Sequence, residues 1–245
     1  MKTAVVIPAR YGSEEIECKV LARIGGKPMI QHVYERCEAA EPEIVVVATD
    51  DERIAEVVEG FGGTALLTSR QHICGTDRVA EAVEKLPYKP ELVVNVQADE
   101  PFIDPSSISE VVRALNCGED MVTLACPITT EEEMLDPFVV KVVVDQSSHA
   151  LYFSRSPIPS ISRARRATPL RHIGIYGYTY NFLKKFASLG PSRLELTESL
   201  EQLRALESGF PILVVLTSSF YPHISVNTPQ DLAAAQALLS EEGKN

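Results

Sequence analysis

The chain lacks the features typical of secreted and membrane-spanning proteins. Its 245 residues include only five cysteines, and these are widely spaced with no C-x-x-C pair. This pattern argues against a disulfide framework and against a structural zinc site. No run approaches the ~20 apolar residues of a transmembrane helix, and the apolar start at 3–9 is too short for a signal peptide. We therefore expect a protein of the reducing cytoplasm.

Basic charge is also scarce. The sequence has 23 Lys and Arg residues against 34 Asp and Glu, which gives a formal net charge of -11. Such an acidic balance argues against general binding to nucleic acid or to membrane surfaces. A phosphate-binding site in this protein must therefore be a local basic cluster on an acidic body. The length allows a sizeable core within one α/β domain.

The first half of the chain alternates between β-branched runs and amphipathic segments. The predicted strands are 3–8, 44–48, 65–68, 92–97 and 121–126. The predicted helices are 29–40, 51–61, 76–86 and 105–115, with Asp50 or Asp51 as a plausible N-cap of the second. This β-α rhythm predicts a mostly parallel sheet with right-handed crossovers.

The second half changes character. Runs at 139–145 and 150–154 suggest a hairpin, and 172–178 reads as a further strand. Predicted helices follow at 181–188, 193–207 and 229–239, with a strand near 212–216. The fold class is therefore α/β, with a mostly parallel Rossmann-like sheet and a small antiparallel excursion. We predict a single domain over 1–245, with the excursion at 130–180 as a candidate dimer arm.

Two acids follow the most apolar of these strands. The run Leu92–Gln97 indicates a strand buried on both faces, and Pro101 ends the segment that carries Asp99 and Glu100. Open α/β sheets bind their ligands at the carboxyl ends of the strands. A carboxylate held there can bind a divalent cation against a phosphate. Taken alone, the same residues also fit two solvated acids before a turn.

Two loops offer places for a phosphate. Arg10, Gly12 and Lys19 follow the first strand, and Gly25-Gly-Lys-Pro28 opens the next helix. Cations beside a glycine-containing loop can cradle a triphosphate, although the loop matches neither a Walker motif nor G-x-G-x-x-G. Gly75 and Arg78 stand at the start of the predicted helix 76–86. For each loop the alternative stays open: an ordinary βα loop in the first case, and Arg78 on a solvated helix face in the second.

Later segments offer polar groups for a second substrate. Arg155 follows a strand, where its guanidinium fork could hold a carboxylate. The segments 171–178 and 200–204 supply hydroxyls, an imidazole and an amide for a polyhydroxylated ligand. Considered singly, His172 and Tyr178 are more often structural polar groups than ligand contacts.

Together and in this order, these pieces resemble one family, the 3-deoxy-manno-octulosonate (Kdo) cytidylyltransferases, also called CMP-Kdo synthetases. The matching runs span almost the whole chain: IPARYGS (7–13), Lys19, GGKPMI (25–30), VVATDD (46–51), CGTDR (74–78), VVNVQADEP (93–101), ALYFSR (150–155), RHIGIYGY (171–178) and LEQLR (200–204). Any single run is weak, but nine collinear runs are specific.

The resemblance implies a magnesium-dependent, usually dimeric nucleotidyltransferase. It transfers CMP from CTP to the anomeric hydroxyl of an eight-carbon sugar acid used in lipopolysaccharide, and it releases pyrophosphate. By position, the implied CTP-binding residues are Arg10, Ser13, Lys19, Gly75 and Arg78, with Arg10, Lys19 and Asp99 as the catalytic set. The implied metal ligands are Asp99 and Asn227. The implied sugar-acid contacts are Gln97, Arg155, His172, Tyr176, Glu201 and Gln202.

Two departures from the family pattern concern these sites. The first loop of the family reads Arg-Tyr-x-Ser-x-Arg-Leu-Pro-Gly-Lys, whereas this chain has Glu15 for the second arginine and Ile16-Glu17-Cys18 before Lys19. Acids at these positions should weaken anion binding unless they turn to solvent or metal. Asn227 replaces the aspartate that assists Asp99 in the family, so the affinity for a divalent ion should fall.

Three hypotheses follow. The favoured one is a Kdo cytidylyltransferase with weakened metal and nucleotide binding, because Arg10, Lys19, Arg78, Asp99 and Arg155 all remain. A second keeps CTP but changes the acceptor to an amino-substituted Kdo or a sialic-acid-like sugar. A third is a catalytically degenerate relative that binds CTP or the sugar without turnover.

Overall fold

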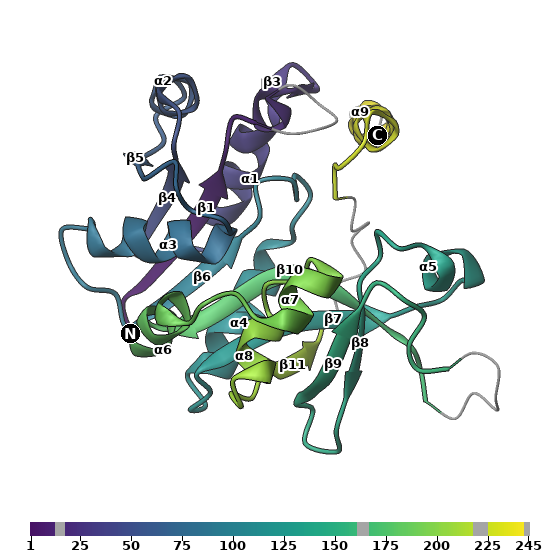
Figure 1. Ribbon diagram of the computed structural model, residues 1–245. Helices are drawn as coiled ribbons and strands as arrows, with labels where there is room; N and C mark the ends of the chain where they lie inside the picture. Colours follow the sequence, from purple (N-terminus) through teal and green to yellow (C-terminus); the bar gives the residue numbers. More distant parts are fainter. Residues whose placement is uncertain (13–17, 161–166, 218–224, 243–245) are drawn as a thin grey trace. The chain divides into compact units, whose positions relative to one another are not determined.

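The computed structural model describes residues 1–12, 18–160, 167–217 and 225–242 (Figure 1). These residues form two compact units: Met1–Ser109 with Ser219–Asn245, and Glu110–Ser218. Ser13, Glu15 and Glu17 lie outside the described residues. Within the described part of the chain, no helix is both long and apolar enough to cross a bilayer.

A parallel sheet forms the centre of the first unit. Its strand order is β6-β1-β4-β5, and every neighbouring pair is parallel. The strands are β1 (Thr3–Ala9), β4 (Ile44–Thr49), β5 (Ala65–Leu67) and β6 (Leu92–Val96). All residues of β1 and β6 are buried, as expected for central strands of a parallel sheet. The carboxyl ends of these strands therefore lie along one edge.

Helices connect these strands. They are α1 (Met29–Glu38), α2 (Glu52–Gly60), α3 (Gly75–Glu84) and α4 (Pro105–Leu115), which contains the sequence boundary between the units. The carboxylate of Asp51 accepts a hydrogen bond from the backbone N–H of Arg53 at 3.0 Å, which confirms the predicted N-cap of α2. Helix α1 packs on β4, and α2 packs on β4 and β5. Helix α3 packs on β1 and β4.

A short hairpin precedes α1, where the sequence predicted only the opening of the helix. The 3-10 helix η1 (Lys19–Leu21) leads into β2 (Arg23–Ile24), which pairs with β3 (Lys27–Pro28). The two linking residues, Gly25 and Gly26, have φ angles of 56° and 86°. A two-residue hairpin turn of this type needs positive φ at both positions, which glycine adopts at little cost.

The second unit combines parallel and antiparallel pairing. Strand β7 (Met121–Pro127) is parallel to β11 (Leu213–Leu216) and antiparallel to β10 (Leu170–Thr179). Strands β8 (Lys141–Val144) and β9 (Ala150–Ser154) form an antiparallel hairpin, and β8 also pairs with β10. These strands are the antiparallel excursion expected at 130–180, and the α/β architecture predicted from the sequence is confirmed.

Strand β10 contains a bulge. Ile173 pairs with Leu124 and Tyr176 pairs with Thr123, so the two residues 174 and 175 of β10 have no partner in β7. The Thr123 hydroxyl lies 2.7 Å from the carbonyl oxygen of Ile175, within the bulge. A bulge of this kind redirects the side chains beside it.

The helices of the second unit are short. They are α5 (Glu131–Leu135), α6 (Tyr180–Ser188), α7 (Arg193–Glu198) and α8 (Leu203–Glu207). The prediction of one helix over 193–207 is wrong, because Ser199 adopts a left-handed conformation with φ 54° and ends α7. The acidic run Glu131–Glu133 is the first turn of α5, where negative charge is favourable.

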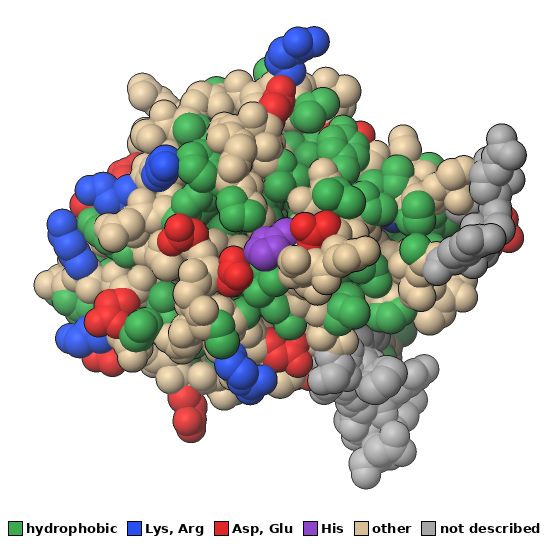
Figure 2. All heavy atoms as spheres, turned by 90° about the horizontal axis from the view of Figure 1, so that it is seen from below, with side chains coloured by type: hydrophobic (Ala, Val, Ile, Leu, Met, Phe, Trp, Pro, Cys, Tyr) green, Lys and Arg blue, Asp and Glu red, His purple; other side chains and the backbone are tan. Residues whose placement is uncertain are grey.

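Several large apolar side chains are exposed, and most of them belong to the second unit. They include Leu135, Phe138, Leu151, Leu196 and Leu216. Figure 2 shows one face of the molecule, on which hydrophobic side chains lie among acidic and basic ones. Scattered exposed leucines are normal for a soluble surface, whereas a contiguous patch indicates a contact surface.

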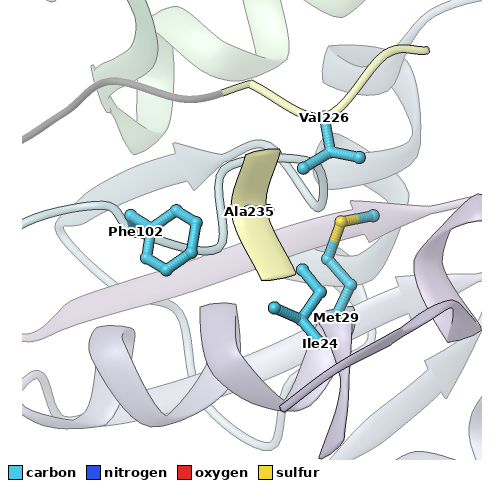
Figure 3. Packing of buried hydrophobic residues seen from close by; sticks show 5 residues of the cluster. All are labelled: Ile24, Met29, Phe102, Val226 and Ala235. Carbon is cyan, nitrogen blue, oxygen red and sulfur yellow. The ribbon is translucent and has the colours of Figure 1, made fainter. Parts of the chain in front are cut away.

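The C-terminal helix α9 (Pro229–Glu242) returns to the first unit. Its residue Ala235 and the preceding Val226 are fully buried in a cluster with Ile24, Met29 and Phe102 (Figure 3). Burial of each large apolar side chain contributes about 1.5–3 kcal/mol. This cluster therefore fixes the residues just before α9 against the rest of the unit.

Candidate active site

Three predicted site residues of the first unit converge. The ammonium nitrogen of Lys19 lies 2.8 Å from Asp99 Oδ2 and 3.1 Å from Asn227 Oδ1. The side chains of Lys19 and Asp99 are 17% and 26% exposed, so the pair is accessible to a ligand. In the sequence, Asp99 lies 80 positions after Lys19, and Asn227 lies 208 positions after it.

Backbone hydrogen bonds fix both oxygen-bearing residues. The N–H of Val226 donates to the carbonyl oxygen of Asp99 at 2.9 Å. The carboxylate of Asp231, in the first turn of α9, accepts the backbone N–H groups of Asn227 (3.0 Å) and Thr228 (2.8 Å). Thr228 in turn accepts the N–H of Asp231 at 3.2 Å, which completes a reciprocal cap before the helix.

The neighbouring acid, Glu100, has a structural contact. It is buried, and its carboxylate accepts a hydrogen bond from the hydroxyl of Ser225. Glu100 and Asp99 therefore differ in environment although they are adjacent. The alternative in which both are solvated acids does not describe this turn.

The donor set at Lys19 fits a magnesium ion that is only partly held by protein. Asp99 offers a carboxylate and Asn227 an amide oxygen. The described residues contain no group of three or more His, Cys, Asp or Glu side chains placed to hold a metal. Magnesium is commonly held by one or two carboxylates together with substrate phosphates and waters. A site with one carboxylate and one amide oxygen thus suits an ion that arrives with a nucleotide.

The start of α3 lies close to the ends of β1 and β6. A Cβ placed on Gly75 would lie 3.4 Å from Pro8 and 3.8 Å from the side-chain oxygen of Gln97. The amide nitrogen of Gln97 donates to Asn95 at 3.1 Å. Arg10 directly follows β1 and is exposed. The glycine therefore permits close approach of a helix N-terminus, which favours anions, to this strand edge.

Arg78 is internally bound. It is only 4% exposed and donates to Asp50 Oδ2 at 2.8 Å and to the Thr68 hydroxyl at 2.6 Å. The alternative of a solvated Arg78 is therefore wrong. A guanidinium has five N–H donors, so these bonds leave further donor capacity in principle. Their immediate consequence is to tie the ends of β4 and β5 to α3.

In the second unit, three of the predicted sugar-acid residues lie near the phenol of a fourth, Tyr176. The rings of His172 and Tyr176 are 5.4 Å apart, a distance set by the bulge in β10. Burial raises the pKa of Tyr176 well above its usual value; the Glu201 charge adds to this rise and the Arg155 charge opposes it. Tyr176 is therefore a neutral phenol, with His172, Glu201 and Arg155 as its neighbours.

His172 is a neutral imidazole. Burial lowers its pKa to about 3, and the nearby charge of Arg171 acts in the same direction. Its Nε2 lies 2.9 Å from the hydroxyl of Thr123. Because that hydroxyl donates its single hydrogen to the carbonyl of Ile175 at 2.7 Å, we assign the imidazole proton to Nε2.

Gln202 supplies an orphaned donor. The side chain is 2% exposed, and its Nε2 has no hydrogen-bond partner among the described residues. Buried amide donors are nearly always paired with protein, water or ligand. Its neighbour Glu201 acts electrostatically on Tyr176, so Gln202 stands next to the group of predicted sugar contacts.

The guanidinium of Arg155 is held by backbone oxygens. Its Nε donates to the carbonyl of Glu198 at 2.9 Å, and its two terminal nitrogens donate to Pro137 (3.1 Å) and Ser199 (3.4 Å). Each terminal nitrogen carries a second hydrogen. Arg155 is thus a fixed fork.

Sequence reasoning missed the residues that support these side chains. The hydroxyl of Thr123 forms a hydrogen bond with His172, and Asp231 accepts the backbone N–H of Asn227. The carbonyl of Glu198 accepts a hydrogen bond from Arg155. The only local signal among them is Thr-Pro-Gln-Asp at 228–231, which has a cap residue, a proline at the first helical position and an acid in the first turn. Thr123 lies mid-strand and Glu198 ends a short helix, so neither shows a pattern.

Comparison with known proteins identifies the family of this chain. The family profile described as "Cytidylyltransferase" matches residues 4–215. A 3-deoxy-manno-octulosonate cytidylyltransferase of Anaeromyxobacter dehalogenans is 50% identical over 240 residues, which are 97% of each chain. This chain belongs to that family. Another member, from Desulfatibacillum aliphaticivorans, is 49% identical over 99% of this chain and 100% of its own.

Solved structures support the same assignment. A CMP:2-keto-3-deoxy-manno-octonic acid synthetase, complexed with CTP, superposes with a TM-score of 0.91 at 41% identity, over 99% of this chain and 100% of that one. A 4-diphosphocytidyl-2C-methyl-D-erythritol synthase from Anaerococcus prevotii shares the fold at 15% identity, with a TM-score of 0.63 and coverage of 97% and 98%. Membership of the family thus agrees with the resemblance seen in the sequence, and the protein is a cytidylyltransferase.

Proposed function

We propose that the protein transfers CMP from CTP to the anomeric hydroxyl of Kdo, with release of pyrophosphate. The observation that carries this proposal is the 50% identity to a 3-deoxy-manno-octulosonate cytidylyltransferase over 97% of both chains. The CTP bound in the solved relative supports the nucleotide half of the reaction. The grouping of His172, Tyr176, Glu201 and Arg155 supports a polar acid as the acceptor.

The proposed chemistry relies mainly on positioning and charge. The sugar hydroxyl attacks the α-phosphorus, and negative charge builds on the phosphoryl oxygens and on the departing pyrophosphate. Lys19 and Arg10, together with the N-terminus of α3 at Gly75, supply positive charge for these oxygens. Ser13 and Arg78 complete the proposed CTP-binding set.

Asp99 and Asn227 would hold magnesium, which neutralises charge on the phosphate oxygens when it is bound. The convergence of both oxygens on the ammonium of Lys19 supports this assignment, because a cation already lies between them. Asn227 supplies no charge, so we expect magnesium to bind more weakly here than between two carboxylates. Activity should therefore need a higher magnesium concentration.

The sugar acid is proposed to contact Gln97, Arg155, His172, Tyr176, Glu201 and Gln202. Arg155 binds the carboxylate of the sugar, and the neutral His172 and Tyr176 form hydrogen bonds with its hydroxyls. Because the pKa of His172 is about 3, this imidazole does not act as a general base near pH 7. Its role is to orient the acceptor.

We further infer a cytoplasmic homodimer that acts in lipopolysaccharide synthesis. The resemblance to a usually dimeric family supports the oligomer. Five free cysteines agree with a reducing compartment. Light scattering of the purified protein tests the oligomeric state, and a monomer at micromolar concentration would contradict it.

The decisive experiment is pyrophosphate release from CTP, Mg²⁺ and Kdo, with mass spectrometry of the product. We expect release that depends on Kdo and a product with the mass of CMP-Kdo. Lys19→Met should abolish most of this activity, whereas Lys184→Met, at an exposed position of α6, should retain it. The proposal fails if wild type releases no pyrophosphate with Kdo, or releases it equally with Kdo omitted.

A further inference from the structure

A buried lysine lies beside the proposed sugar-acid site. Lys141, at the start of β8, is 0% exposed. Its ammonium group donates three hydrogen bonds, all to backbone carbonyls: Asp136 (2.9 Å), Val139 (2.6 Å) and Arg155 (2.6 Å). An ammonium has three donors, so this set uses all of them. Burial lowers the pKa of Lys141, a cost that an apolar residue at this position would avoid.

The three acceptors belong to two separate segments. Asp136 and Val139 lie in the turn 136–139 between α5 and β8, and Arg155 directly follows β9. Lys141 pairs with Ser154 across the β8–β9 hairpin, which places its side chain next to the backbone of Arg155. The ammonium therefore joins the turn to the end of β9.

Arg155 also binds the 136–139 turn. One terminal nitrogen of its guanidinium donates to the carbonyl of Pro137, in the same turn that Lys141 holds. The other side-chain bonds of Arg155 reach the carbonyls of Glu198 and Ser199. The Glu198 carboxylate in turn accepts the backbone N–H of Arg155 at 3.0 Å and the Ser154 hydroxyl at 2.7 Å. Lys141 and Arg155 thus each bind three main-chain oxygens, and both contact the 136–139 turn.

We propose that Lys141 is a positioning residue for the sugar-acid site. Its ammonium group holds the 136–139 turn and the backbone of Arg155, so that the Arg155 guanidinium keeps the orientation that binds the carboxylate of the sugar acid. This inference rests on the proposed function, since the sugar acid is the ligand assigned to Arg155. The three hydrogen bonds of the Lys141 ammonium end on main-chain oxygens, and Lys141 acts through Arg155.

The first test compares Lys141→Met with Lys184→Met, a matched loss of one lysine at an exposed position of α6. Methionine keeps the length and the apolar stem but removes the three donors. We expect the KM for Kdo to rise about tenfold or more in Lys141→Met, as for a displaced ligand-binding group. The KM for CTP should stay within about twofold, because the nucleotide residues belong to the first unit. Equal rises in both KM values, or no rise for Kdo, overturn the proposal.

The second test asks whether Lys141 acts through Arg155. In Arg155→Met the guanidinium is absent, so adding Lys141→Met should raise the KM for Kdo by less than about twofold further. Multiplicative effects of the two substitutions overturn the proposal, because they would indicate a role independent of Arg155.

A third readout does not depend on turnover. The Nε–H of Arg155 donates to the carbonyl of Glu198 at 2.9 Å and gives an NMR signal. This signal is assigned as the one that disappears in Arg155→Lys. We expect this signal to shift or broaden in Lys141→Met and to stay unchanged in Lys184→Met; an unchanged signal in both overturns the proposal. If wild type makes no CMP-Kdo, the proposed function fails while this measurement still decides the positioning role. Should Lys141→Met not fold, Lys141→Gln, which keeps amide donors without the charge, replaces it in each test.

Discussion

Asn227 provides a sharp test of the proposed metal site. Its amide oxygen lies 3.1 Å from the ammonium of Lys19, which is also 2.8 Å from Asp99. The substitution Asn227→Asp keeps the size of the side chain and adds one negative charge at this point. The backbone of residue 227 is held by Asp231, so the new carboxylate should occupy the position of the amide.

The expected effect follows from Coulomb's law. Two unit charges 4 Å apart gain about 1 kcal/mol at the dielectric constant of water, so a divalent ion gains about 2 kcal/mol from the added carboxylate. Each 1.4 kcal/mol corresponds to about a tenfold change in affinity. We therefore expect the magnesium concentration for half-maximal activity to fall by about tenfold or more in Asn227→Asp.

The assay is a magnesium titration of pyrophosphate release at saturating CTP and Kdo, with Mn²⁺ binding followed by electron paramagnetic resonance as a second measurement. Asn181→Asp, at an exposed position of α6, controls for the change in net charge. The same magnesium requirement in wild type and Asn227→Asp would refute the reasoning, because residue 227 would then not face the ion.

Two further predictions concern stability. Gly25→Ala places a side chain at φ 56° and 3.1 Å from Leu239 of α9, so it should destabilise by about 1–2 kcal/mol, whereas Gly60→Ala, with open space in α2, should stabilise by about 0.5–1 kcal/mol. Urea unfolding measures both, and equal signs would contradict the prediction. The folded pKa of His172 is about 3 against 6.5 for a free imidazole, so below pH 6.5 only the unfolded state gains this proton. The contribution of the neutral His172 to the free energy of unfolding is complete above pH 6.5 and falls by about 1.4 kcal/mol for each pH unit below it. In His172→Gln, the free energy of unfolding should therefore depend less on pH between pH 6.5 and 5. Parallel slopes for wild type and variant would argue against a buried neutral His172.

Local patterns predicted the regular elements well. Helix α4 and strand β9 have the predicted bounds, because amphipathic spacing and turn residues delimit them in the sequence. The interruption at Ser199 was not predictable, since no glycine or proline marks it. The β2–β3 hairpin did have a signal in the sequence, because Gly25-Gly26 is typical of a two-residue hairpin turn. The prediction that these residues open the next helix did not include this turn.

Predicting the site depended on a different kind of information. Asp99 could be placed at the sheet edge from its strand alone. Its partner Lys19 contacts Asp99 and Asn227, which lie 80 and 208 positions further along the chain, and no local pattern encodes such a distance. The resemblance to a family supplied those partners. It did not supply Thr123 or Lys141, because their roles depend on a bulge and on buried carbonyls that appear only in three dimensions.

The contact between Lys19 and Asp99 also bears on how a nucleotide approaches. One ammonium, one carboxylate and one amide sum to zero charge, so these three side chains attract a triphosphate less than Lys19 alone would. The molecule around it has a formal charge of -11 and repels a triphosphate at long range. Dissolved ions screen that repulsion over about 10 Å at 0.1 M. Moderate salt should therefore speed the association of CTP, the reverse of the behaviour expected for a protein that attracts nucleotides with a basic surface.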